Sequence, residues 1–293
     1  MKGEFTVGIV TVTYNSESVF QEFWDSLSSQ TLNSYKLYVV DNASTDHTLD
    51  VLKSRSNDGR ITVIKNQSNM GVAEGNNQGI QMALRDGCEL ILLLNNDTVF
   101  GEDLLVQLCG AIINADMVTP KILYFDDQKR LWFAGGHFAA KRGYAGVHRG
   151  LGEHDRGQYD DERSIDYAPT CCLLIKREVF ARIGLMDSKY FVYYDDVDFC
   201  WRARRAGVRM QYIPRVALFH KVSSLTGGEE SSFGMRFNTR NKVYFLRKHF
   251  AFPKKEIFIL AYFCSLFLRY LKGVDSWPIY RLRVRAFFEG IRV

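Results

Sequence analysis

Two amides and a carboxylate, Asn95, Asn96 and Asp97, directly follow an unbroken apolar run from Leu90 to Leu94. Such a run is typical of a strand that is buried on both faces in the middle of a parallel sheet. Ligands of open α/β sheets collect at the carboxyl ends of the strands, so these side chains are placed to meet a substrate or a metal ion. The alternative is a turn that caps a helix beginning near Glu102.

A second polar group, formed by Asp195, Asp196 and Asp198, opens a predicted helix. Acids in a first helical turn interact favourably with the helix dipole, which explains part of the pattern. Three acids in four residues exceed that need, and their repulsion and partial burial raise the pKa of one carboxyl. A carboxylate of this kind suits a general base that takes a proton from a hydroxyl. Asp198 lies four residues before Arg202, which predicts an ion pair within the helix.

The chain lacks the glycine-rich loops that bind phosphate in many α/β proteins. No GxGxxG follows the first strand pattern, where Tyr14-Asn15-Ser16 stands instead, and no GxxxxGK followed by Ser or Thr occurs. A bound phosphate must then be neutralised by other means, and a divalent cation held at a strand end is the obvious candidate. Asp97 fits that role.

Alternating strand and helix patterns position these residues. Three β-α units precede the Leu90–Leu94 strand, which predicts an α/β fold with a mostly parallel sheet and right-handed crossovers. Their strands are Phe5–Thr13, Tyr35–Val40 and Ile61–Lys65. Later strands are predicted at Met117–Tyr124, Ile165–Ile175 and Met210–Ile213, and helices at Glu102–Asn114, Arg177–Ile183, from Asp195 onward and at Phe233–Phe250.

The segment from Lys141 to Arg163 interrupts the regular pattern. It holds five glycines and ten charged residues in 23, which predicts a mobile surface loop rather than a core element. Contacts that select the substrate are expected from this segment, from Trp132 or from His137.

Composition bounds the class of protein. With 293 residues and 46% hydrophobic content, the chain can bury a sizeable core. Its six cysteines show no CxxC or zinc-ligand spacing, which predicts reduced, buried thiols and a cytosolic compartment. The N-terminus enters a strand pattern directly, without the apolar region or cleavage site of a secretion signal.

Residues 251–293 carry a strong excess of positive charge, with eight Lys/Arg against three acids. Within them, the uncharged run Ile257–Leu268 is shorter than the roughly 20 residues that span a bilayer. Basic neighbours and the aromatic residues Trp277 and Tyr280 favour a segment that lies on an anionic membrane. A buried helix or a dimer contact is the alternative. Single-stranded nucleic acid also suits aromatic and basic residues, but the chain carries no RNA-binding signature.

Several motifs together resemble family 2 glycosyltransferases, and the rhamnosyltransferase-like branch is the most similar. The resemblance extends from about Val7 to Phe250, and the motifs occur in the order and spacing of that family. They are Thr13-Tyr14-Asn15, Val39-Val40-Asp41-Asn42-Ala43-Ser44, Asn69-Met70-Gly71 with Gly75-Asn76-Asn77-Gln78-Gly79, Leu94-Asn95-Asn96-Asp97, and Tyr194-Asp195-Asp196-Val197-Asp198. The resemblance implies the GT-A fold and an inverting reaction.

The resemblance also implies a role for each matched residue. Asp41 would accept the N3 hydrogen of a uracil or thymine ring, although its sequence context also suits an Asx turn. The full set that would bind the nucleotide is Thr13, Asn15, Asp41, Asn42, Gly71, Asn76 and Asn96. Asp196 would be the general base of catalysis.

At the metal position, Asn95 replaces the first acid of the family's DxD motif. An amide oxygen coordinates Mg²⁺ or Mn²⁺ more weakly than a carboxylate, so Asp97 is the main ligand expected. His220 lies where related enzymes place a further ligand; a hydrogen-bonded core histidine is its alternative. Arg240 and Asn241, in the last helix before the basic segment, either reach the diphosphate or solvate a helix face.

We therefore expect a GT-A glycosyltransferase domain at residues 1–250 and a basic, amphipathic helical extension at 251–293. The enzyme would transfer a sugar, L-rhamnose from a dTDP- or UDP-sugar, to a hydroxyl of a lipid-linked glycan or polysaccharide during cell-surface glycan synthesis. It would work in the cytoplasm, at the inner face of the membrane, without nucleic acid. A sugar-nucleotide pyrophosphorylase shares the fold but should carry a Gly-rich loop. A silent sugar-nucleotide or glycan-binding module would not need Asp41, Asp97 and Asp196 together.

Overall fold

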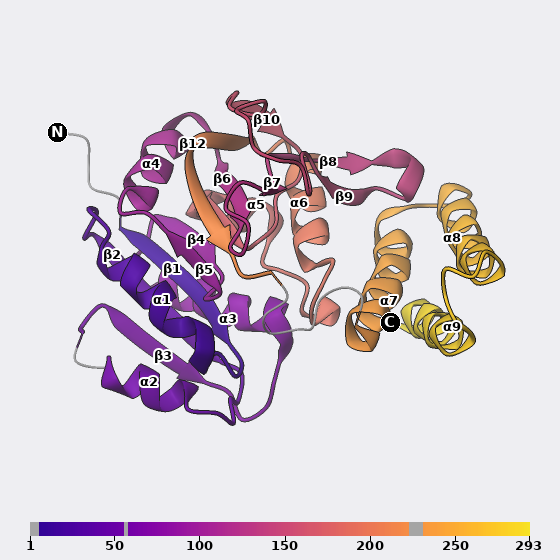
Figure 1. The fold of residues 1–293 in the computed structure, drawn as a ribbon, viewed down its shortest axis with the longest axis horizontal. Helices are drawn as coiled ribbons and strands as arrows, with labels where there is room; N and C mark the ends of the chain where they lie inside the picture. The colour runs from indigo at the N-terminus through magenta and orange to yellow at the C-terminus, as the bar shows by residue number, and fades with distance from the viewer. Residues whose placement is uncertain (1–5, 56–57, 223–230) are drawn as a thin grey trace.

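The computed structural model describes residues 6–55, 58–222 and 231–293. Its N-terminal part alternates strands and helices, as the sequence predicts, and these elements form the larger body of the molecule (Figure 1). In chain order they are β1 (Val7–Thr13), α1 (Glu17–Ser28), β2 (Tyr35–Asp41), α2 (Thr48–Ser54), β3 (Ile61–Lys65), α3 (Gly71–Arg85) and β4 (Leu90–Leu94).

These four strands are parallel and lie in the order β4-β1-β2-β3. In this register Thr13 is the partner of Asp41, and Asp41 is the partner of Lys65. The polar residues that end the strands therefore meet at one edge of the sheet. Every residue of β4 is buried, in agreement with its apolar sequence.

Beyond β4 the sheet becomes mixed. β11 runs antiparallel to both β4 and β6, whereas β12 is parallel to β6, and the full order is β10-β12-β6-β11-β4-β1-β2-β3. The elements of this part are β5 (Thr98–Phe100), α4 (Leu104–Ala111), η1 (Ile112–Asn114), β6 (Met117–Tyr124), β7 (Leu131–Phe133), β8 (Gly136–Ala139), η2 (Ala140–Arg142), β9 (Ala145–His148), β10 (Arg163–Ile165), β11 (Cys172–Lys176), α5 (Arg177–Ile183), η3 (Ser188–Tyr190), α6 (Asp195–Arg205) and β12 (Met210–His220).

Two predicted strands differ from the observed ones. The predicted strand Ile165–Ile175 is two strands, because β10 pairs with β12 and β11 pairs with β4 at another place in the sheet. The strand predicted at Met210–Ile213 continues to His220 after an irregularity between Ile213 and Ala217. Its second half pairs with both β5 and β6. These partners extend the strand beyond Met210–Ile213, where the sequence pattern of a strand is strongest.

The segment from Lys141 to Arg163 lies mostly at the surface, as predicted, but it also contains a strand and is anchored by ion pairs; its mobility stays a prediction. Its first part is half of a hairpin, in which β9 pairs with β8. Further along, Asp155 and Asp160 form ion pairs with Lys121, a buried residue of β6. The charged residues that suggest a solvated loop in the sequence thus find partners in the tertiary structure.

Helix α3 packs unusually close to β1. A Cβ on Gly79 would collide with the side chain of Val10, and one on Gly75 would lie 2.8 Å from Val12. These two glycines share one face of α3, which allows the helix to lie directly on the strand. The strand end that carries Thr13 is therefore fixed relative to the start of α3.

Three helices form the C-terminal end of the molecule, on the side away from β3 (Figure 1). They are α7 (Ser232–His249), α8 (Lys254–Leu271) and α9 (Trp277–Arg292). Val243 of α7, Leu266 of α8 and Phe287 of α9 form a small core of their own. The predicted helical extension is present; its boundary at residue 250 stays a prediction, and α7 shares the core of the extension.

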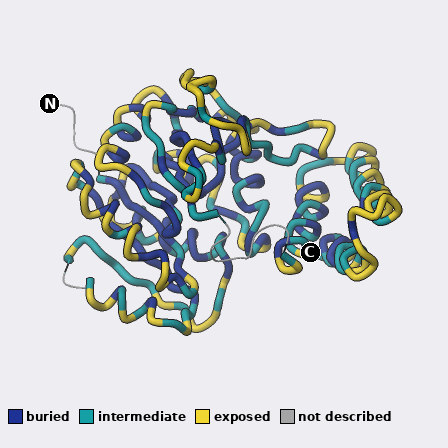
Figure 2. The backbone as a smooth tube through the Cα atoms, viewed as in Figure 1, coloured by how far each residue is buried: buried dark blue, intermediate teal, exposed yellow. Residues whose placement is uncertain are grey.

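Much of helix α8 is exposed on its outer side (Figure 2). Its exposed apolar residues recur at helical spacing, and they are Ile257, Leu260, Phe267, Leu268 and Leu271. Among the described residues, no helix is long and apolar enough to cross a membrane. All six cysteines are free thiols, as predicted, and only Cys264 of α8 is exposed.

Candidate active site

Asp41 ends β2 with a buried carboxylate. The Thr13 hydroxyl donates to its Oδ1 at 3.0 Å, and the Ser44 hydroxyl donates to the same oxygen at 2.6 Å. The backbone N–H of Ser44 donates to Oδ2 at 3.1 Å. The local turn that the sequence suggests is therefore present. A carboxylate has about four lone-pair sites, so Asp41 keeps acceptor capacity for a ligand in this state.

Asn15 and Asn42 join neighbouring loops at the same edge of the sheet. The side-chain oxygen of Asn15 accepts a hydrogen bond of 2.8 Å from the backbone of Thr45. Asn42 is buried and donates to the carbonyl of Gly71 at 3.0 Å, so it ties β2 to the start of α3. Asn76 is buried on α3. The structure thus brings most residues of the predicted nucleotide set to one end of the parallel strands.

The Asn95-Asn96-Asp97 turn connects β4 to β5. Asn96 donates to the carbonyl of Val12 at 2.6 Å, which links this turn to the end of β1. Its buried Oδ1 has no hydrogen-bond partner among the described residues. The alternative interpretation, a cap of the following helix, is wrong: β5 intervenes, and Asp103 is the residue that precedes α4.

Strand β12 brings His220 to this turn from far along the chain. Its Nε2 lies 3.2 Å from Oδ1 of Asp97, and both side chains are buried. Burial alone would lower the pKa of His220, but the Cys171 thiol and the Asp97 carboxylate outweigh it and hold this pKa well above its ordinary value. The ring of Trp132 packs edge-on against His220 at 4.7 Å. Two ligands of one Mg²⁺ or Mn²⁺ ion also lie about 3 Å apart, so the geometry suits both an ion pair and a shared cation.

The acids that open α6 lie in three different environments. Burial, followed by the charge of Asp196, raises the pKa of Asp195 well above its ordinary value. Asp196 is partly exposed, and Tyr167 donates to its Oδ2 at 2.6 Å. Asp198 is fully buried and forms the predicted ion pair with Arg202 at 2.8 Å.

Asp198 also contacts two side chains of α7. Lys248 and His249 each lie 2.7 Å from its Oδ1. Burial by itself would raise the pKa of Asp198, but the hydrogen bond from His249 and the charges of Arg202 and Lys248 lower it far below its ordinary range. This carboxylate fastens α6 to α7 and is not available as a base.

The loop before α6 is held in an uncommon conformation. Phe191, Tyr193 and Tyr194 all have left-handed φ angles, between 60° and 65°. The side-chain amide of Asn241 donates to the carbonyls of Tyr190, Val192 and Tyr193 at 2.8–2.9 Å. Asn241 is fully buried and does not solvate a helix face; its contact with a diphosphate stays a prediction. A role for Asn241 in supporting the loop is not evident from the sequence. The only signal is an asparagine within the long helix predicted at Phe233–Phe250.

Gly71 connects this loop to the nucleotide side of the site. Its φ is +84°, and a Cβ there would lie 2.5 Å from the backbone oxygen of Phe191. The next residue, Val72, donates its N–H to that same oxygen at 2.6 Å. Close packing against the loop before α6 therefore explains why a glycine is needed at position 71. Its contact with a nucleotide stays a prediction. A continuous set of contacts now links Asp97, Asp41 and the loop before α6, whose first turn carries Asp196.

The α/β sheet with polar strand ends, joined to an acid cluster at a helix start, has the GT-A fold. The model of the family "Glycosyl transferase family 2" matches residues 8–184, and the chain belongs to this family. The pyrophosphorylase and the silent binding module are therefore set aside.

Two curated relatives show the range of similarity. The low-salt glycan biosynthesis hexosyltransferase Agl10 of Haloferax volcanii is 26% identical over 251 residues, covering 85% of this chain and 77% of the relative. The N-acetylglucosaminyl-diphospho-decaprenol L-rhamnosyltransferase of Mycobacterium tuberculosis is 28% identical over 88 residues, covering 30% of this chain and 29% of the relative.

Among solved structures, GalNAc-T7 with UDP, GalNAc and Mn²⁺ has a TM-score of 0.69 at 14% sequence identity. The superposition covers all of this chain and 57% of that one. At this identity the likeness establishes the fold alone. This chain thus spans less than two thirds of GalNAc-T7 and of the mycobacterial relative.

Proposed function

We propose that this enzyme is an inverting hexosyltransferase that moves L-rhamnose from a dTDP- or UDP-sugar to a hydroxyl of a lipid-linked glycan. The observation that carries the proposal is the continuous contact between the strand-end residues Asp41 and Asp97 and the loop before Asp196. A donor bound at the strand ends would have its reacting carbon beside the acid cluster. Rhamnose is chosen because the mycobacterial relative is named for it.

A divalent cation, Mg²⁺ or Mn²⁺, is proposed to bind at the turn after β4. Among the described residues no three His, Cys, Asp or Glu side chains cluster as a complete metal site. One carboxylate with diphosphate oxygens and water is the usual arrangement for Mg²⁺, so Asp97 suffices as the main protein ligand, with His220 and Asn95 beside it. The unpartnered oxygen of Asn96 suits the same polar ligand. The ion would neutralise the diphosphate as it leaves.

Asp196 is proposed as the general base. A hydroxyl is a poor nucleophile near neutral pH, so a carboxylate must accept its proton as the glycosidic bond forms. Asp195 is buried and therefore less accessible to an acceptor hydroxyl, and Asp198 is buried and fully engaged with cations. Asp196 remains partly exposed, and the hydroxyl of Tyr167 fixes its orientation. Among the three acids, Asp196 is thus the carboxylate that is both accessible to a substrate and held in a fixed orientation.

The proposed place of work is the inner surface of the cytoplasmic membrane. The exposed apolar side of α8 is followed by exposed basic residues, including Lys272 and Arg281. An apolar helix face with basic neighbours is complementary to an anionic bilayer surface. An enzyme held there would meet an acceptor that is anchored in the lipid.

The proposal is tested with dTDP- and UDP-sugars plus Mn²⁺, by measuring slow release of free nucleoside diphosphate. We expect release from one donor, its loss with EDTA, and at least a tenfold reduction in Asp97→Ala at every Mn²⁺ concentration. Asp126→Ala, which removes an exposed acid near β6, is the matched control and should be unchanged. EDTA-resistant release by Asp97→Ala would refute the metal assignment, and absence of binding to any nucleotide sugar would refute the function.

A further inference from the structure

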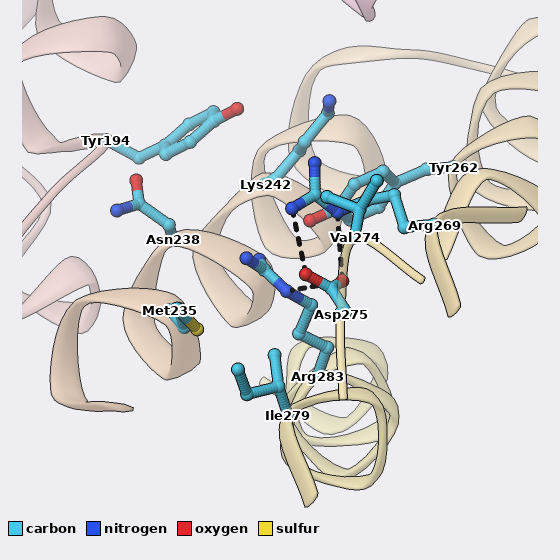
Figure 3. Close-up of a pocket in the computed structure, with 10 residues that line it drawn as sticks. All are labelled: Tyr194, Met235, Asn238, Lys242, Tyr262, Arg269, Val274, Asp275, Ile279 and Arg283. Atoms are coloured by element: carbon cyan, nitrogen blue, oxygen red, sulfur yellow. Dashed lines mark hydrogen bonds and ion pairs between the residues drawn. The ribbon is translucent and has the colours of Figure 1, made fainter. Parts of the chain in front are cut away.

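A cavity of about 470 Å³ lies between the three C-terminal helices, outside the site described above (Figure 3). Helix α7 contributes Lys242, α8 contributes Arg269, and α9 contributes Arg283. The single acid of the lining is Asp275, in the turn between α8 and α9. The cavity therefore collects three cations around one carboxylate.

The one negative charge of Asp275 cannot neutralise the three cationic side chains. Its almost fully buried carboxylate is shared by two guanidinium groups, with Arg269 at 2.8 Å and Arg283 at 3.1 Å. Figure 3 shows both arginines pointing to it from opposite helices. The shared carboxylate holds the two guanidinium groups in fixed positions and leaves an excess of positive charge.

Lys242 has no acid within ion-pair distance among the described residues. Its ammonium lies 4.2 Å from the centre of the Tyr262 ring. Burial, and then the nearby charge of Arg142, lower the pKa of Lys242 to about 8. A partly buried cation without a counter-ion is costly, and a bound anion would stabilise it.

The cavity lies between the acid cluster and the exposed apolar surface. On one side it is lined by Tyr194, which directly precedes Asp195 of α6. On the other side it is lined by Val274, an exposed residue that follows the exposed Leu271 of α8. An anionic ligand in the cavity would thus have apolar surface on one side of it and the proposed base on the other.

We infer that this cavity binds the diphosphate of a lipid-linked acceptor, with the apolar chain along α8 and the acceptor sugar toward Asp196. The inference rests on the proposed function, which it deepens by naming the acceptor class. A diphosphate offers several charged oxygens to Lys242, Arg269 and Arg283, in charge-assisted hydrogen bonds. The name of the mycobacterial relative includes a diphosphate joined to a prenyl chain, which is the same chemistry.

The test uses geranylgeranyl diphosphate as the probe, with Mn²⁺ and whichever of UDP or dTDP stabilises the protein, so that the donor position is filled. Geranylgeraniol lacks the diphosphate and controls for apolar binding. Lys242→Gln is the informative variant because it breaks no ion pair, whereas replacing Arg269 or Arg283 would disturb the buried Asp275. Lys242→Arg keeps the charge, and Lys272→Gln removes an exposed charge outside the cavity.

We expect geranylgeranyl diphosphate to bind the wild type at least tenfold more tightly than geranylgeraniol does. Lys242→Gln should weaken the diphosphate about tenfold, while Lys242→Arg and Lys272→Gln stay within about twofold of the wild type. Partition of Lys242→Gln onto phosphatidylglycerol vesicles should be unchanged, because a bilayer meets the exposed residues and not the cavity. An unchanged melting temperature shows that the fold is intact.

Equal affinity for the alcohol and the diphosphate would overturn the inference, as would an unaffected Lys242→Gln. A parallel loss of vesicle binding would assign the cavity to a phospholipid headgroup instead, and would overturn it too. Failure of the proposed function is seen separately, because it abolishes nucleotide binding and nucleoside diphosphate release, which Lys242→Gln should leave intact.

Discussion

Two regions of the site hold their polar residues by different means. One is formed by the strand ends of β1, β2 and β4, and the other by the loop before α6 with the acids that follow it. Asp41 is bound by Thr13 and Ser44, which lie on its partner strand or three residues away. Asp198 and the loop before it are bound by α7, some fifty residues further along the chain. The first region is assembled by local turns and strand register, and the second depends on how distant helices pack. The geometry of the second region, the loop before α6 and its acids, is therefore expected to be the more sensitive to single substitutions.

The largest effect is expected at Asp196. Asp196→Asn keeps the shape of the side chain but cannot take a proton, so the rate of sugar transfer should fall by about 10²- to 10⁴-fold. Donor affinity, measured by thermal shift with the nucleotide sugar, should stay unchanged. A transfer rate near that of the wild type would move the base to Asp195, and silent substitutions at both positions would refute the catalytic assignment of the cluster.

The next effect concerns stability and pH at Asp198. Its pKa is lower in the folded protein than in the unfolded chain, so its contribution to stability is present above about pH 4 and is lost as the pH falls further. Asp198→Asn leaves Arg202 and Lys248 without their carboxylate and should lower the free energy of unfolding at pH 7 by about 3–5 kcal/mol. Urea unfolding from pH 7 to pH 3 measures both. A variant that matches the wild type at pH 7 would contradict this account.

Asn241→Ala tests how much the hydrogen bonds of Asn241 stabilise the loop before α6. Its loss leaves carbonyls of the loop without a donor, which should cost about 2 kcal/mol in the free energy of unfolding. Because the loop precedes Asp196, kcat should fall while donor binding is retained. Asn114→Ala, which removes an exposed asparagine of η1 outside both sites, is the control. A loss of stability with an unchanged kcat would make Asn241 structural only.

The smallest effects are expected on the basic surface of α9. Arg281→Gln and Arg285→Gln should each weaken binding to phosphatidylglycerol vesicles about fivefold, since a basic residue near an anionic surface contributes about 1 kcal/mol. Both side chains are exposed, so the fold should be unaffected. Lys65→Gln, at the end of β3 on the opposite side of the sheet, should not change the binding. If wild-type protein ignores these vesicles at low salt, α8 and α9 meet a protein partner instead.

The sequence alone determined the parallel strands, the polar residues at their ends and the family. Apolar runs followed by Asp41 and Asp97 are local patterns, and strand register places them at one edge of the sheet. The tertiary structure decided which carboxylate is buried, which is paired and which is accessible, because these properties depend on Tyr167, Asn241, Lys248 and His249, all distant in the chain. It also decided the order in the Lys141–Arg163 segment, where the buried Lys121 supplies partners that no local pattern reveals. The cationic cavity has the same origin, since three separate helices each contribute one of its charges.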